Sequence, residues 1–132
     1  MASVVPAVNQ LQYHAGMGGG ADPNGLISED ARRGIVTQAY SPLAGDAHAA
    51  LLGDATVKAI GLKHNRSTAQ VALRWVLQHG HALATSTANP EYMAEDLEAA
   101  GTDWSLSAAE LATLDALDVA PDDPVKAMCR LS

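Results

Sequence analysis

Three short segments of the chain are mostly apolar, without a strict alternation of apolar and polar positions. They cover residues 4–13, 35–41 and 83–87. Apolar runs of this length are typical of parallel strands that are covered on both faces. The pattern therefore predicts three β-strands in a parallel sheet.

Between and after these segments, helical patterns begin at recognisable capping residues. The motifs "STAQ" from Ser67 and "SAAE" from Ser107 have the spacing of a capping box. Asn89 precedes a proline and an acid, and Asp54 precedes a pattern that runs to about residue 64. We predict a helix after each of these four residues, and a loop over the glycine-rich residues 15–24.

The order of strands and helices predicts an α/β fold with a parallel sheet. We assign residues 1–118 to one domain and residues 119–132 to an irregular tail. Three parallel strands leave two unpaired edges, which proteins normally cover or close. We therefore expect further strands, supplied in front of this segment or by another chain.

Composition narrows the class of protein. The chain has 132 residues, 48% of them hydrophobic, and a net charge of −7, which argues against binding nucleic acid. No apolar run approaches the roughly 20 residues of a membrane helix, and the first residues do not resemble a signal peptide. The single cysteine, Cys129, cannot form an internal disulfide. We expect a cytoplasmic protein.

Two patterns that resemble ligand sites are weaker than they look. The glycines at 16–20 lack the spacing of a phosphate-binding loop, so a flexible connection is expected. His79 and His81 flank a glycine without a third ligand nearby, so we predict no metal site.

Four motifs occur together in a characteristic order: "PAVNQLQYH", "GIVTQAYSPLAG", "STAQVALRWVLQHG" and "NPEYMAEDL". Together they resemble the carboxyl-terminal half of the aldo-keto reductases. The resemblance implies a partial (β/α)8 TIM barrel made of roughly the last three β/α units, with its active-site face at the carboxyl ends of the strands. The first five strands of that barrel would then lie outside this segment, which we expect to be a fragment of the family's fold.

The resemblance assigns a cofactor role to eight residues. Gln10 would hydrogen-bond the nicotinamide carboxamide, and Tyr40 would stack on the nicotinamide ring. Ser41 and Leu43 would follow the pyrophosphate. The positions that contact the 2′-phosphate and the adenine of NADP in the family correspond to Ser86, Thr87, Glu95 and Asp96.

The cofactor positions depart from the family pattern in charge. The lysine and arginine that usually bind the 2′-phosphate are replaced by Ser86 and Tyr92. Two cations suit a dianion, and both are missing here. NADP and NAD therefore both stay open as the cofactor.

The catalytic Asp, Tyr, Lys and His of the family have no counterpart in this chain, so we assign no catalytic residue. The implied reaction is the NAD(P)H-dependent reduction of a small aldehyde or ketone to an alcohol. One alternative is a non-catalytic half-barrel that pairs with a second copy of itself or with a separate amino-terminal half. A further alternative is a small independent enzyme that uses Tyr40 or His14, with His14 near the mouth of the barrel.

Overall fold

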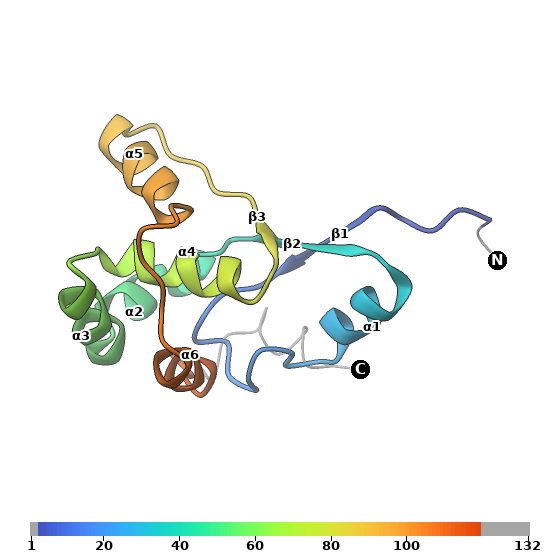
Figure 1. The fold of residues 1–132 in the computed structure, drawn as a ribbon, viewed down its shortest axis with the longest axis horizontal. Coiled ribbons are helices and arrows are strands. Elements are labelled where there is room, and N and C mark those ends of the chain that lie inside the picture. Colours follow the sequence, from blue (N-terminus) through green and yellow to red (C-terminus); the bar gives the residue numbers. More distant parts are fainter. Residues whose placement is uncertain (1–2, 120–132) are drawn as a thin grey trace.

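The computed structural model describes residues 3–119 and contains one parallel sheet of three strands (Figure 1). The strands are β1 (Val8–Gln12), β2 (Val36–Tyr40) and β3 (Ala82–Leu83), in the spatial order β1-β2-β3. The predicted α/β class and the parallel arrangement of the strands are confirmed. Within this part of the chain, no helix is both long and apolar enough to cross a membrane.

Within residues 3–119, six α-helices and one short 3-10 helix connect the strands and follow them. Their bounds are α1 (Leu26–Arg33), η1 (Gly45–Ala47), α2 (His48–Gly53), α3 (Ala55–His64), α4 (Thr68–Gln78), α5 (Pro90–Ala99) and α6 (Ala108–Asp115). Each predicted cap is confirmed: Asp54, Ser67, Asn89 and Ser107 accept hydrogen bonds from backbone N–H groups in the first turns of their helices. Both capping boxes are complete.

The two faces of the sheet have different surroundings. On β2, Thr37 and Ala39 are 4% and 0% exposed, because they face the helices. The alternate residues of β2 and their partners on β1 form the opposite face, which we call the open face: Val8, Gln10, Gln12, Val36, Gln38 and Tyr40. Val8 and Val36 lie opposite each other there and are 50% and 52% exposed.

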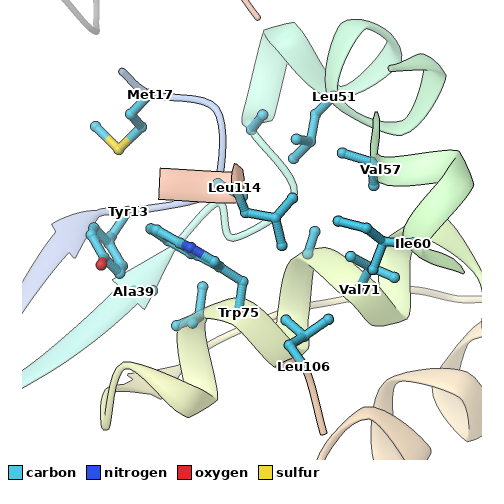
Figure 2. Packing of buried hydrophobic residues seen from close by; sticks show 14 residues of the cluster. Tyr13, Met17, Ala39, Leu51, Val57, Ile60, Val71, Trp75, Leu106 and Leu114 are labelled. Atoms are coloured by element: carbon cyan, nitrogen blue, oxygen red, sulfur yellow. The ribbon is translucent and has the colours of Figure 1, made fainter. Parts of the chain in front are cut away.

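The hydrophobic core lies on the helical side of the sheet and is organised around α4 (Figure 2). Trp75 of α4 is fully buried and stacks on Tyr13 with 4.8 Å between ring centroids. Leu51 of α2, Val57 of α3 and Leu114 of α6 belong to the same cluster. The chain thus builds a core without phenylalanine by packing aliphatic side chains around one tryptophan.

All three predicted strands are longer than the observed ones, the second by one residue at each end. Residues 4–7 precede the pairing, because β2 begins only at Val36, after the glycine that ends α1. The third strand covers Ala82–Leu83 instead of residues 83–87. Its partner β2 ends at Tyr40, and the next residue, Ser41, turns away with φ 47°. Residues 85–87 therefore have no strand to pair with.

The predicted tail falls largely outside the described residues. Val119 is described, and its N–H donates to the carbonyl oxygen of Gly16 at 3.0 Å. Met17 and Asp118 form an isolated antiparallel bridge beside it. The end of the domain assigned to residues 1–118 is thus attached to the glycine-rich loop.

Candidate functional site

The open face carries two of the predicted cofactor residues, Gln10 in the middle of β1 and Tyr40 at the carboxyl end of β2. Gln10 lies directly opposite Gln38 in the β1-β2 register, and Tyr40 lies opposite Gln12. The Nε2 of Gln10 donates to the Oε1 of Gln38 at 2.9 Å. Tyr40 is 40% exposed. An amide and an aromatic ring therefore share one accessible surface.

The turn after Tyr40 has an unusual backbone. Ser41 and Ala44 adopt φ values of 47° and 72°, which side chains other than glycine rarely adopt. The N–H of Ala44 donates to the carbonyl oxygen of Ser41 at 2.9 Å, which closes the turn around Leu43. Backbone strain of this kind is often found at binding sites, where surrounding packing holds it.

A groove of about 420 Å³ begins at this turn. Five of the eight predicted cofactor residues line it: Leu43, Ser86, Thr87, Glu95 and Asp96. They come from three places in the chain, namely the turn after β2, the segment after β3, and α5. Ser67, Thr68 and Ala69, at the amino end of α4, form a further part of the wall. Gln10, Tyr40 and Ser41 lie outside this wall.

The groove is acidic. The described residues that line it include Glu95 and Asp96 but no lysine or arginine, and His48 is the remaining titratable side chain besides Tyr92. Burial, reinforced by the neighbouring charge of Glu95, raises the pKa of Asp96 above its ordinary value. The hydroxyl groups of Thr68, Ser86 and Thr87 supply hydrogen-bond donors.

A second hollow of about 540 Å³ shares the wall formed by Ser86 and Thr87. Its remaining lining is mainly apolar and includes Leu77, Leu83, Met93 and Leu97. Leu97 is an exposed apolar residue of α5. Thr85 and Asp96 also line both hollows, so the two share one wall and differ in the rest of their lining.

Asn9, which precedes Gln10, has a structural role. Its Nδ2 donates to both carboxylate oxygens of Asp30 at 3.1 Å. The Oγ1 of Thr37 donates to the same carboxylate at 2.9 Å. Asp30 is buried and belongs to α1, so this carboxylate ties α1 to β1 and β2. No sequence motif pointed to Asp30 or to Gln38.

The histidine expected near the mouth of the barrel is buried. His14 is 3% exposed, and its Nδ1 lies 2.8 Å from the carbonyl oxygen of Ala15. It is therefore not available on the open face, in contrast to the prediction. Tyr13 is equally buried, and burial, together with the charges of Asp115 and Asp22, raises the pKa of its phenol. A raised pKa is the opposite of what an activated proton donor needs.

The paired histidines also have local partners. The Nε2 of His79 lies 2.8 Å from an oxygen of Asp115, and His81 meets the Tyr13 ring edge-on with 5.2 Å between centroids. Among the described side chains, no three His, Cys, Asp or Glu residues come together as a metal site would require.

Known proteins identify the fold. The sequence model of the aldo/keto reductase family matches residues 1–119. Morphine 6-dehydrogenase of Pseudomonas putida is 36% identical over 127 residues, which cover 89% of this chain and 41% of that protein. An aldo-keto reductase of Mycolicibacterium smegmatis is 40% identical over 113 residues, covering 86% of this chain and 37% of that protein.

Solved structures agree with this assignment. A variant of Gox0644 in complex with NADPH superimposes with a TM-score of 0.76 at 30% identity, over 87% of this chain and 39% of that one. The fold of MGS-M4, an aldo-keto reductase from a deep-sea metagenome library, gives a TM-score of 0.81 at 21% identity, over 92% of this chain and 43% of that one.

The chain belongs to the aldo/keto reductase family. It spans about 40% of the length of the relatives that it matches. Its three parallel strands and their helices correspond to part of a TIM barrel, as the resemblance implied.

Proposed function

We propose that these 132 residues form the nicotinamide-dinucleotide side of an aldo-keto reductase that reduces a small aldehyde or ketone to an alcohol. The observation that carries this proposal is the clustering of Leu43, Ser86, Thr87, Glu95 and Asp96 around one groove. The strained turn at Ser41 connects that groove to the open face, where Gln10 and Tyr40 lie.

Each part of this surface suits one part of a dinucleotide. Tyr40 offers a flat, accessible ring on which a nicotinamide ring stacks, which exposes one face of the cofactor for hydride transfer. Gln10 both donates to and accepts from a primary carboxamide. The hydroxyl groups and the amino end of α4 in the groove suit the pyrophosphate. The bound cofactor would supply the hydride.

We further propose that the groove prefers NADH over NADPH. A 2′-phosphate is a dianion that requires cations, whereas the described lining holds Glu95 and Asp96 and neither lysine nor arginine. Carboxylates instead accept hydrogen bonds from the free 2′-hydroxyl of NADH. The charge of the groove therefore opposes the phosphorylated cofactor.

Titration of the chain with each reduced cofactor, followed by nicotinamide fluorescence, tests the proposal. NADH is expected to bind at least about five-fold more tightly than NADPH, since one uncompensated charge contact is worth about 1–3 kcal/mol. Tyr40→Ala should weaken NADH binding by removing the stacking surface. Equal binding of the two cofactors would contradict the preference, and binding of neither would contradict the proposed site.

Turnover is expected to require groups outside these residues. Under the family resemblance, the catalytic Asp, Tyr, Lys and His have no counterpart in this chain, and Tyr13 and His14 are buried. The 132-residue chain should therefore bind NADH without oxidising it when a simple aldehyde is added. Oxidation that is abolished by Tyr40→Phe would instead support a small independent enzyme.

One observation favours the non-catalytic alternative, in which the half-barrel pairs with another chain. The open face presents Val8 and Val36 half exposed, side by side on adjacent strands. A second copy or a separate amino-terminal half would cover this surface. Light scattering of the purified chain, with and without the candidate partner, distinguishes these two occupants.

A further inference from the structure

We propose that Gln38 is a positioning residue for Gln10 and prepares its side chain to bind a carboxamide. This inference rests on the proposed function, because the ligand carboxamide is that of a nicotinamide ring. Gln38 would not itself contact the cofactor. It would hold the Gln10 side chain so that the remaining N–H donor and the carbonyl oxygen of Gln10 point towards the ligand carboxamide.

The register of the sheet places the two glutamines together. Gln10 and Gln38 are direct partners in the parallel pairing of β1 and β2. The neighbours of Gln38 along the strand, Thr37 and Ala39, are buried against the helices. Because side chains alternate along a strand, Gln38 must lie on the open face together with Gln10 and Tyr40.

The hydrogen bond to Gln38 determines which donor and acceptor groups of Gln10 are left for a ligand. Its Nε2 donates one proton to the Oε1 of Gln38 at 2.9 Å. A primary amide carries two N–H donors and one acceptor oxygen, so Gln10 keeps one N–H and its carbonyl oxygen. One donor beside one acceptor is the complement of another primary amide. Gln38 thereby leaves Gln10 with the pair of groups that a carboxamide ligand requires.

A role in folding does not account for this pair. The hydrogen bond between the two side chains is exposed, and an exposed hydrogen bond between neutral groups adds little to the free energy of unfolding because water replaces it. Its value lies in restricting an otherwise mobile side chain. Ordering a flexible side chain on binding weakens affinity, and a side chain that is already ordered avoids that loss.

Comparison of two nucleotides separates this role from general binding. NADH contains the nicotinamide ring, and ADP-ribose is the same molecule without it. Gln38→Leu should weaken NADH binding by roughly 3- to 10-fold, as expected from ordering one side chain, and leave ADP-ribose binding unchanged. Gln38→Glu keeps an acceptor oxygen for Gln10 and should retain most of the NADH affinity.

Gln12 offers a matched control. It lies on the same strand and face as Gln10, opposite Tyr40, and Gln12→Leu makes the same change of side chain as Gln38→Leu. This variant should bind both nucleotides as the unchanged chain does. Thermal unfolding of the two leucine variants is expected to match that of the unchanged chain, which shows that any loss of binding is local.

The outcomes distinguish the two proposals. If the unchanged chain binds neither nucleotide, the proposed function and the role of Gln38 both fail. If it binds both and Gln38→Leu leaves NADH binding unchanged, or lowers the affinity for both nucleotides equally, the role of Gln38 alone is overturned. A loss of NADH binding in Gln12→Leu as large as that in Gln38→Leu would also overturn it.

Discussion

The charge of the groove depends on the side chains of Ser86 and Tyr92. Both residues line the groove beside Asp96, and neither carries a cation. The double variant Ser86→Lys with Tyr92→Arg restores two cations at positions that correspond to the family's phosphate contacts. We expect it to raise the affinity for NADPH relative to NADH by at least about ten-fold, since hydrogen bonds to charged groups contribute about 1.5–3 kcal/mol each.

Fluorescence titration of both cofactors measures this change. Leu62→Lys is the control, because Leu62 on α3 is 84% exposed and does not line the groove. It adds positive charge to the molecule without placing it at the site. A similar gain for NADPH in this control would mean that net charge, and not position, determines the preference.

Glu110 gives a pH dependence at the scale of one side chain. Its carboxylate accepts from Lys63 Nζ at 2.7 Å and from the backbone N–H of Ser107 at 2.8 Å, and lies 3.0 Å from His64 Nε2. Burial alone would raise the pKa of Glu110, but these hydrogen bonds outweigh it and lower the pKa to about 2. The ionised form is therefore favoured in the folded chain.

The sign of the effect follows from linkage. Because folding lowers this pKa from 4.5, the carboxylate contributes stability above pH 4.5, and the contribution is lost as the pH falls towards 2. Glu110→Gln should unfold at lower urea than the unchanged chain at pH 7, and the difference should shrink between pH 4.5 and 2. A difference that is constant over this range would contradict the assignment of the pKa.

At the scale of elements, Asp30 connects one helix to two strands. Asp30→Ala removes the acceptor of Asn9 and of Thr37, which is itself buried. An unsatisfied buried donor costs about 1–3 kcal/mol, so we expect the free energy of unfolding to fall by about 2 kcal/mol in urea denaturation. Glu29→Ala on the same helix removes only exposed ion pairs with Arg32 and Arg33.

The control variant at Glu29 should cost less than about 1 kcal/mol, because exposed ion pairs contribute little. If both variants lose the same stability, the effect belongs to helix α1 in general. Loss of stability at Asp30 without a comparable loss at Glu29 identifies the buried connection as its source.

The elements also show which features the sequence predicts. Helix starts depend on residues three positions apart, so the capping boxes at Ser67 and Ser107 were correct from the sequence. Strand ends depend on distant partners: the third strand stops at Leu83 because β2 turns at Ser41. The contact of Gln10 with Gln38 likewise depends on a register that no local motif specifies.

At the scale of the whole molecule, the helices cover one face of the sheet and leave the other accessible. Val8, Val36 and Tyr40 are among the exposed large apolar residues, and all three lie on the open face. Each 100 Å² of apolar surface removed from water contributes roughly 2.5 kcal/mol. A surface of this kind therefore favours association, and unpaired strand edges beside it favour pairing with another sheet.

We expect the 132-residue chain to self-associate at micromolar concentration in size-exclusion chromatography, with hydrogen exchange slowed in β1 and β2 as the concentration rises. Val36→Lys places a charge at the amino end of the open face, beside Val8, and should shift the chain towards monomer. Leu62→Lys removes an even more exposed apolar side chain from α3 and should leave the association unchanged, because that helix lies away from the open face. A chain that stays monomeric at all concentrations and unfolds in one cooperative transition would mean that the open face needs no cover. Such a result would leave Tyr40 and Gln10 accessible to a cofactor in the isolated chain. Association through the open face would instead cover these residues, so cofactor binding would weaken as the protein concentration increases.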